Sequence, residues 1–321
     1  MSINLSYYDI TQIDYREDTT NNGAIPQSGA WIPLVAGFQS FNWKKAENRL
    51  QHRGNSQSLT IDKSVKNWAE WELGLVVLKY EASPLFDWWN FIHLAFYGGA
   101  TGAPVIRPGN VWLAAKYNRA TPEYFTAFGS KIEEITIRGN MTQDAMTILM
   151  RGMSRGFSFN TTNYVQGTAT RQADPTKNPI VPASDVTIKI DNVDETQNIQ
   201  DWTLTFRRTY RKSGLSATAA GSSSQIATDG KFFREFTPET IDARFNINID
   251  PVGTASDRLI DHINDAALLT CELQAENATN GKQIQFTASK TTQADQNHAE
   301  GQSPSTIPLE IVASTINVNT L

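Results

Sequence analysis

Apolar and polar residues alternate along much of the chain. The pattern is clearest in 132–138 (IEEITIR), 186–190 (VTIKI), 202–207 (WTLTFR) and 245–249 (FNINI). Successive side chains of a β-strand point to opposite faces, so a period of two predicts strands with one buried face and one polar face. Many short strands separated by turns predict a mainly β fold of the sandwich or small-barrel type.

Two segments break this pattern and predict one packed helix in each half of the chain. The first covers 84–96, with Ser83 as N-cap, Pro84 at the first helical position and Gly98-Gly99 after its end. The second covers 256 to about Leu269, with Ser256 as N-cap and Asp257 in the first turn.

The first predicted helix is apolar almost all round. Its large apolar residues include Phe86, Trp88, Trp89, Phe91 and Ile92. A helix of this kind must be covered on more than one side, and a single small sheet covers only one. The other half of the chain or a neighbouring subunit must therefore cover the rest.

Three pairs of segments indicate that the chain contains two copies of one domain. Segment 111–131 matches 269–290, segment 37–49 matches 199–212, and segment 147–154 matches 307–314. The three matches are collinear, and each is shifted by about 160 residues, as expected for a duplication. We predict two tandem, similar β-barrel or sandwich domains.

The boundaries follow from composition. Residues 1–36 are polar at first and predict an N-terminal arm, 37–160 a first β domain, 161–184 a proline-containing linker, and 185–321 a second β domain. After the matched basic stretches, both halves are expected to project a basic loop, at 50–60 and at 211–232.

Charge and composition limit the classes of function. The formal net charge is −5 and no basic patch dominates, so tight DNA binding is not expected. Cys271 is the single cysteine, which excludes an intrachain disulfide framework. The start of the chain does not read as a secretory signal, and no apolar run approaches the ~20 residues needed to cross a bilayer. We expect synthesis in a reducing cytoplasm and no membrane partner.

The search for catalytic chemistry finds no convincing site. The glycine-containing loops lack the spacing of nucleotide-binding motifs, and no His, Cys and Asp cluster has metal-ligand spacing. Glu133 and Glu134 are neighbours in a predicted strand, so we expect them to face opposite sides. We therefore expect no enzyme activity, no cofactor and no metal.

Basic residues recur at matched positions in the two halves, and two interpretations stay open. They are solubilising charge on a strand, or they pair with carboxylates on a neighbour. The residues are Lys44, Lys45 and Arg49 in the first half and Arg207, Arg208, Arg211 and Lys212 in the second.

In the order of its elements the chain resembles the tail tube (major tail) proteins of long-tailed bacteriophages and related archaeal viruses, in a duplicated form. The likeness is carried by EYFTAFGSKIEEITIRGNMTQDAMTILMRGMSRG, SDVTIKIDNVDETQNIQDWTLTFRR, and FNINIDPVGTASDRLIDHI leading into LTCELQAENATNGKQIQFTASK. It extends over most of residues 37–321.

The resemblance implies a structural virion protein of the virion tail, assembled in the host cytoplasm. Three two-domain chains would form a pseudo-hexameric ring, and stacked rings would form a tube for ejection of double-stranded DNA. Strands of neighbouring chains would join into one inner barrel. Further partners would be the tape-measure, neck or terminator, and tail-tip proteins.

The resemblance also implies roles for particular residues. Thr187, Asp191, Thr203 and Thr205 would face the lumen. The loops with His52, Arg53 and Asn55, and with Ser213, Ser222 and Asp229, would contact the next ring, together with the arm 1–30. Phe86, Trp88, Trp89, Phe91 and Ile92 would pack between subunits.

Other classes of function stay open. A glycan-binding β module would need exposed aromatic side chains. A tail-tip or baseplate hub protein is closer in class. A hydrolase is less favoured, because the sequence contains no evident nucleophile with a base partner.

Overall fold

The protein, described from a computed structural model, is built almost entirely of β-strands. The structure describes residues 10–18, 31–34, 37–53, 59–76, 111–117, 123–140, 146–160, 186–190, 192–216, 231–249, 268–275, 282–293, 307–312 and 315–320. Within these ranges the one helical turn is η4, a 3-10 helix at Thr196–Asn198. The prediction of a mainly β protein is confirmed.

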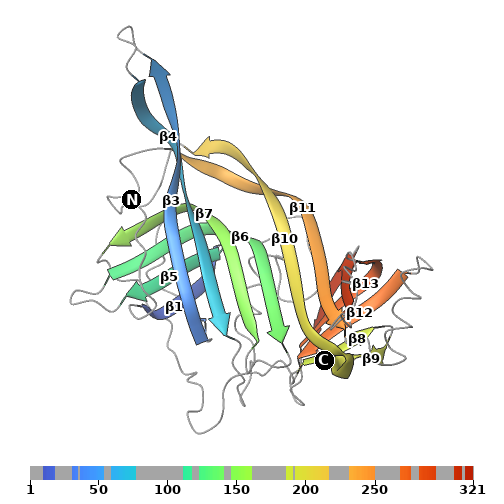
Figure 1. Cartoon of the computed structure of the whole chain (residues 1–321). Helices are drawn as coiled ribbons and strands as arrows, with labels where there is room; N and C mark the ends of the chain where they lie inside the picture. Colours follow the sequence, from blue (N-terminus) through green and yellow to red (C-terminus); the bar gives the residue numbers. More distant parts are fainter. Residues whose placement is uncertain are drawn as a thin grey trace, which may run out of the picture.

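The described strands follow the chain in two sets (Figure 1). The first set is β1 (Ile10–Glu17), β2 (Ile32–Pro33), β3 (Gly37–Arg53), β4 (Leu59–Val76), β5 (Val111–Tyr117), β6 (Glu123–Asn140) and β7 (Thr147–Asn160). The second set is β8 (Val186–Ile190), β9 (Val193–Asp194), β10 (Ile199–Ser216), β11 (Lys231–Ile249), β12 (Leu268–Ala275), β13 (Lys282–Gln293), β14 (Ile307–Val312) and β15 (Thr315–Thr320).

Hydrogen-bonded neighbours have a fixed order within each set. In the first, the order is β2–β1–β5–β6–β7–β4–β3, and every pair is antiparallel. In the second, the order is β9–β8–β12–β13–β14–β11–β10, again antiparallel throughout, and β15 pairs with β13 as well. If the strands of each set are numbered from the start of that set, the two orders are the same: second, first, fifth, sixth, seventh, fourth, third.

The two sets join into one open sheet along a seam between β6 and β10. These strands are antiparallel, with seven registered pairs from Asp201 opposite Asn140 to Arg207 opposite Glu134. A second, shorter link pairs β11 with β4 in parallel, at Lys231–Phe232 and Lys66–Asn67. The sheet therefore runs without interruption from the first half of the chain to the second.

One edge of β6 serves two partners in succession. Up to Ser130 the strand pairs with β5, and from Glu134 it pairs with β10. Gly129, next to the last residue of the β5-paired part, has a φ of 58°, which glycine readily adopts, and its N–H donates to Asp18 Oδ2 at 3.1 Å. The change of partner lets the strand belong both to the first half and to the seam.

The main core lies on one face of this sheet. Residues two apart on five neighbouring strands fill it: Leu73 and Leu75 of β4, Ile148 and Met150 of β7, Ile135 and Ile137 of β6, Leu204 and Phe206 of β10, and Phe245 and Ile247 of β11. All are buried, as the alternating sequence pattern predicted for β6, β10 and β11. Each fully buried side chain of this size contributes about 1.5–3 kcal/mol.

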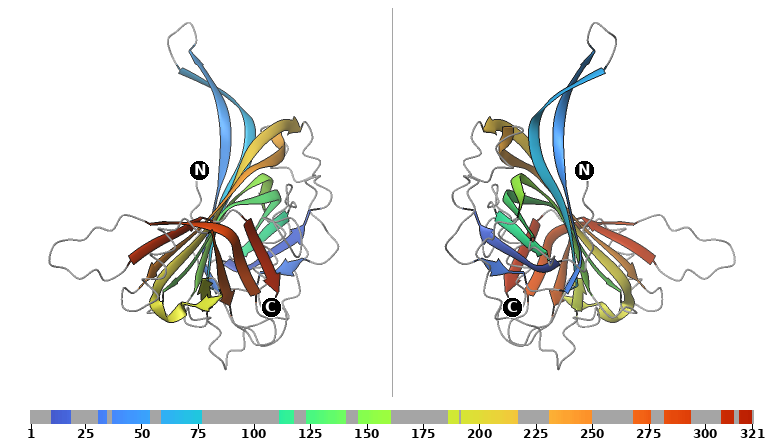
Figure 2. Two further views of the ribbon diagram at one scale, coloured as in Figure 1. Left: turned by 90° about the vertical axis from the view of Figure 1, so that its right-hand side faces the viewer. Right: turned by 90° about the vertical axis from the view of Figure 1, so that its left-hand side faces the viewer.

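Two long hairpins extend from the sheet. The β3–β4 hairpin is paired from Gly37 opposite Val76 to Arg53 opposite Leu59, and the far ends of its two strands extend beyond the other strands in both side views (Figure 2). At its base, Trp68 forms a small cluster with Met153 and with Tyr210 and Phe236 of the β10–β11 hairpin. The Lys212 ammonium lies 4.0 Å from the centre of the Trp68 ring. The second hairpin thus packs against the first.

The first difference from the sequence prediction concerns the N-terminal arm. Residues Ile10–Glu17, inside the predicted arm 1–36, form β1, which pairs with β5. Ile13 and Tyr15 are buried in the main core. Their alternation covers only a few residues, too few to stand out in a polar segment. This part of the arm belongs to the fold.

Several predicted elements lie outside the described residues. They are the helix 84–96, the linker 161–184, and residues 256–267 of the second helix. The predicted end of that helix, at Leu269, falls in β12. Within the described ranges no helix has the length and apolar character needed to span a membrane.

Candidate functional site

The polar face of the sheet carries a row of charged residues of alternating sign, which we call the charge row. Glu72 of β4, Arg151 of β7, Glu134 of β6, Arg207 of β10 and Asp242 of β11 are successive register partners across five strands. Registered residues on adjacent strands share a face, so all five lie on the side opposite the main core.

Ion pairs connect the middle of the row. Arg151 Nε lies 2.8 Å from Glu72 Oε2, and Arg151 Nη1 lies 3.9 Å from Glu134 Oε1. Arg207 Nε donates to the other oxygen of Glu134 at 2.9 Å. Glu134 therefore bridges two arginines, one in its own half and one across the seam.

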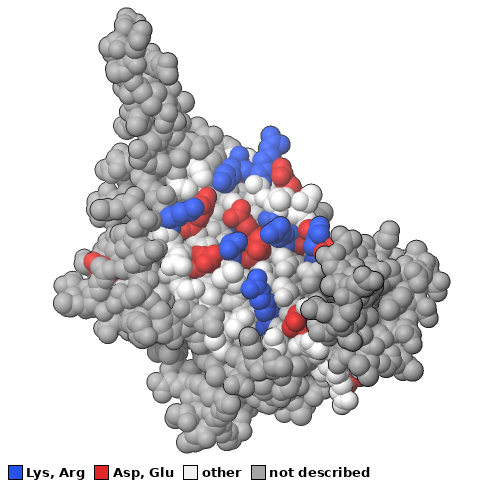
Figure 3. Space-filling view, in the orientation of Figure 1, with Lys and Arg blue, Asp and Glu red and all other residues white. Residues whose placement is uncertain are grey.

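Further ion pairs extend the row at both ends. On the β3 side, Lys44 Nζ lies 2.9 Å from Glu70 Oε2. On the β14 side, Arg244 contacts Asp242 Oδ2 at 3.0 Å through Nε and Glu310 Oε1 at 3.2 Å through Nη1. Figure 3 shows the positive and negative side chains interleaved over this face.

The charge row is close to electrically neutral. With the ion pairs at its two ends included, as from here on, it contains four cations (Lys44, Arg151, Arg207 and Arg244) and five carboxylates (Glu70, Glu72, Glu134, Asp242 and Glu310), a formal charge of −1. The arginines are well exposed, at 63% for Arg207 and 53% for Arg151. Solvent screens exposed pairs, so they contribute little to stability. The row therefore has more effect on the electrostatic character of the face than on its folding.

The ion pairs shift the pKa of their members in the expected directions. The hydrogen bond with Glu72 raises the pKa of Arg151. The hydrogen bond with Asp242 raises that of Arg244. Burial acts to raise the pKa of Glu70, but hydrogen bonds from Lys44 and Trp68 outweigh it and the pKa is lowered.

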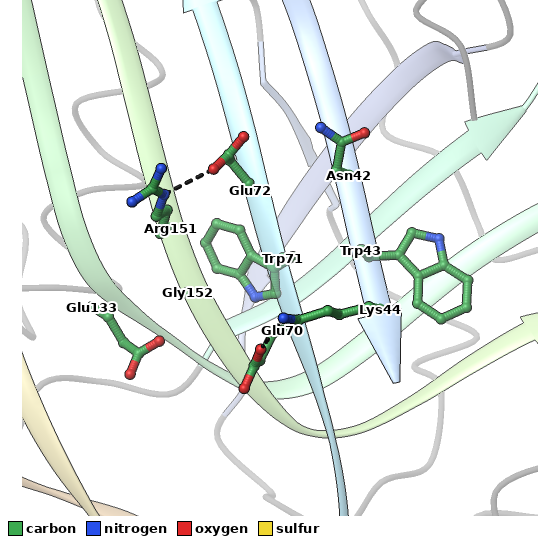
Figure 4. Close-up of a pocket in the computed structure, with 9 residues that line it drawn as sticks. All are labelled: Asn42, Trp43, Lys44, Glu70, Trp71, Glu72, Glu133, Arg151 and Gly152. Carbon is green, nitrogen blue, oxygen red and sulfur yellow. Dashed lines mark hydrogen bonds and ion pairs between the residues drawn. The ribbon is translucent and has the colours of Figure 1, made fainter. Parts of the chain in front are cut away.

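Beside the row lies a trough of about 330 Å³, lined by Asn42, Trp43, Lys44, Glu70, Trp71, Glu72, Glu133, Arg151 and Gly152 (Figure 4). Both Glu133 and Glu134 line the hollow that adjoins it. The prediction that these two glutamates face opposite sides is wrong. The register of β6 against β7 shifts between Ile132 and Glu134, so that Glu133 is an extra residue of a bulge.

Burial raises the pKa of Glu133. The neighbouring carboxylates bind cations: Glu70 binds Lys44, and Glu72 and Glu134 bind Arg151. In the described part of the chain no group of three or more His, Cys, Asp or Glu residues could hold a metal ion. The charged groups that line the trough, apart from Glu133, are thus paired with one another.

The trough is also a poor aromatic platform. Trp71 is buried, and its indole N–H donates to Ser154 Oγ at 3.1 Å. The ring of Trp43 stacks on Phe125, with 4.7 Å between ring centres. A sugar ring would need exposed aromatic faces, which the burial of Trp71 and the stacking of Trp43 on Phe125 do not provide.

The structure brings together two of the four residues predicted to face a lumen. Thr205 of β10 is the register partner of Thr136 on β6 and of Arg244 on β11. Thr203 precedes Thr205 by two residues in β10 and so lies on the same face. Thr187 lies in β8, which four other strands separate from β10 in the sheet. Asp191 lies outside the described residues.

Three of the residues predicted in loops lie in strands. His52 and Arg53 pair with Thr60 and Leu59 at the end of β3–β4. Ser213 of β10 pairs with Glu235. The strands continue further than the sequence pattern indicated, because cross-strand pairing holds polar residues in extended conformation. The other predicted contact residues, Asn55, Ser222, Asp229, Phe86, Trp88, Trp89, Phe91 and Ile92, lie outside the described residues.

Of the matched basic residues, Lys44 and Arg207 pair with carboxylates on adjacent strands of the same chain, rather than remaining as unpaired solubilising charge. The sequence pattern did not predict that Lys44 and Arg207 belong to a row of alternating charges. Glu72, Arg244 and Glu310 each stand between apolar residues, which marks them as polar-face positions. Their alignment depends on the strand register, which is not readable from one sequence.

A comparison of the chain with models of known protein families found no match, and a comparison with curated proteins found no significant similarity.

Proposed function

We propose that the chain is a structural virion protein of the tail tube type. Three copies, each contributing two similar β domains, form a pseudo-hexameric ring, and stacked rings form a conduit for double-stranded DNA in the virion tail. Tape-measure, neck or terminator, and tail-tip proteins are the further partners of such a tube.

One observation carries this proposal: the matching strand order of the two halves. β1, β5, β6, β7, β4 and β3 follow one another in the first set as β8, β12, β13, β14, β11 and β10 do in the second. The three sequence matches fall on corresponding strands: β5–β6 with β12–β13, β3 with β10, and β7 with β14. Agreement of sequence and topology is what a duplication produces.

The seam supports a specific mode of assembly. Across it, β10 of the second half pairs with the late part of β6 in the first half. The strands that correspond to these two are β3 and β13. Among the described strands, β3 pairs with β4 alone, and the part of β13 beyond Lys290 pairs with β14 alone.

Unpaired strand edges readily pair with other chains. If β3 of one chain joins β13 of the next as β10 joins β6, each chain adds two units to a continuous inner sheet. Three chains then close a ring of six units, and the polar face with Thr203, Thr205 and the charge row lines its lumen.

The test is electron microscopy of the purified chain with averaging of end-on views. The proposal predicts stacked rings with three chains each. Rings of six chains would contradict the duplicated form. Monomers that bind glycans would favour a glycan-binding module, although the burial of Trp71 and the stacking of Trp43 on Phe125 do not support that function.

A further inference from the structure

We propose that the carboxylates of the charge row mask its arginines from DNA phosphates, so that the polar face is non-adhesive to double-stranded DNA although it is rich in cations. This inference rests on the proposed function, because it takes this face to be the one that DNA passes. It adds a mechanism and names the residues.

The problem that the masking solves is a general one. Arginines exposed in a groove or channel bind phosphates and release counterions, which gives affinity that falls steeply with salt. Arg151 and Arg207 have more than half of their side-chain surface exposed, so they would reach a duplex lying on the face.

The geometry shows how their charge is neutralised. Arg207 directs Nε at Glu134, and Arg151 directs Nε at Glu72 and Nη1 towards Glu134. A bound phosphate would have to displace carboxylates that are already in place and that repel it. Hydrogen bonds between arginine and carboxylate are charge-assisted and stronger than neutral ones.

Glu134 is the central residue of this arrangement. It is the least exposed carboxylate of the row, at 19%, and it contacts both arginines. Its position opposite Arg151 on one side and Arg207 on the other is fixed by backbone pairing rather than by side-chain freedom. The masking is therefore built into the sheet.

Arg138 offers an internal comparison. It lies on β6 four residues beyond Glu134, is exposed on the same face, and is opposite Thr203. The structure gives it no ion pair with any residue of the described ranges. If residual DNA binding by this face exists, Arg138 is expected to supply part of it.

The experiment measures binding of a short DNA duplex to the purified chain by fluorescence anisotropy over a range of salt concentrations. Glu134→Gln should raise the affinity severalfold and steepen the slope of log K against log [salt] by about 0.9, the value for one new phosphate contact. Adding Arg207→Gln to this variant removes the unmasked cation, and the double variant has the same net charge as the wild type. It should restore wild-type binding.

Two controls separate masking from net charge and from misfolding. Glu17→Gln removes one exposed carboxylate on β1, away from the row, and should leave the salt slope unchanged. Glu72→Gln unmasks Arg151 inside the first half and leaves the seam unchanged. It should also strengthen DNA binding, and it provides the test if Glu134→Gln, at the seam, fails to fold. Arg138→Gln should weaken whatever binding the wild type has.

The inference is overturned if Glu134→Gln and Glu72→Gln bind DNA no better than Glu17→Gln, or if the wild type binds DNA as tightly as they do. Electron microscopy of the same preparations reports assembly separately. Tubes with unchanged DNA binding would contradict only the masking, and absence of tubes in the wild type would contradict the proposed function.

Discussion

Gly139 of β6 and Trp202 of β10 lie directly opposite each other across the seam, and the indole fills the space that a side chain on residue 139 would need. A Cβ at that position would lie 2.5 Å from Trp202 Cε2. The same relation joins Gly152 with Trp71, also register partners, where a Cβ would lie 2.3 Å from Cζ2. Aromatic residues placed over cross-strand glycines pin the register of a sheet.

Gly139→Ala should therefore destabilise the chain by about 1–3 kcal/mol, because an overpacked site forces its neighbours to move. Gly152→Ala should cost at least as much, since its Cβ would also meet the backbone oxygen of Lys131 at 2.4 Å. Urea unfolding of the unassembled chain measures both. A Gly139→Ala variant as stable as the wild type would show that the seam is looser than these distances indicate.

The two tryptophans differ in the hydrogen bonding of the indole. Trp71 donates to Ser154 Oγ at 3.1 Å, whereas the buried N–H of Trp202 has no partner among the described residues. Replacing each with Phe removes the same atoms. We expect Trp71→Phe to lose about 1 kcal/mol more than Trp202→Phe, the usual net value of one hydrogen bond.

Unfolding free energies from denaturant titrations measure this difference. Ser154→Ala serves as the control: it should cost less in the Trp71→Phe background than in the wild type, because the shared bond is already gone. Equal losses for the two tryptophan variants would mean that the bond to Ser154 adds nothing to stability.

The sequence predicted the local part of this fold well. The alternation of Leu204 and Phe206 with polar residues, and of Phe245 and Ile247 with asparagines, placed the buried and exposed faces of β10 and β11 correctly. Such patterns are local, because the side-chain period follows from the backbone alone.

The remaining features depend on which strand pairs with which. Glu72, Arg151, Glu134 and Arg207 form a row only because four strands from different parts of the chain have matching registers. The bulge at Glu133 also arises from pairing with β7, and it reverses the face expected for one glutamate. One sequence contains no direct signal for either.

Lys131 makes folding stability depend on pH. The side chain is buried, and burial, helped by Arg208 and Arg155, lowers its pKa from 10.5 to about 7. Between these values the unfolded chain binds a proton that the folded chain does not. Stability should therefore rise with pH from about 7 towards 10, by up to about 1.4 kcal/mol per unit.

Lys131→Met should remove most of this slope and raise stability near pH 7. Denaturant unfolding at several pH values between 7 and 9.5 checks it. Higher pH is avoided because burial also raises the pKa of Tyr210. Above pH 10 this tyrosine ionises in the unfolded chain but not in the folded chain, so it lowers stability as pH rises. Parallel pH profiles for the wild type and Lys131→Met would contradict the assignment.

The β10–β11 hairpin provides the sharpest test of stacking. Its strands run to Ser216 and Lys231, well past the main core, and its inner part packs on Trp68 through Tyr210 and Phe236. Replacing residues 217–229 with a short Gly-Ser turn leaves these contacts and the core intact. The variant should fold with wild-type stability, measured by thermal unfolding, and should form rings.

Under the proposed function this variant should no longer form long tubes in electron micrographs, because the shortened hairpin lacks the surface expected to meet the next ring. A matched variant replaces residues 54–58, which connect β3 to β4 in the sequence, in the same way. If both tips contact the next ring, each variant alone shortens the tubes and the combination abolishes them. Normal tubes from the 217–229 variant would show that this hairpin does not contribute to stacking. The proposed ring would not be contradicted, because it depends on the β3 edge and the seam.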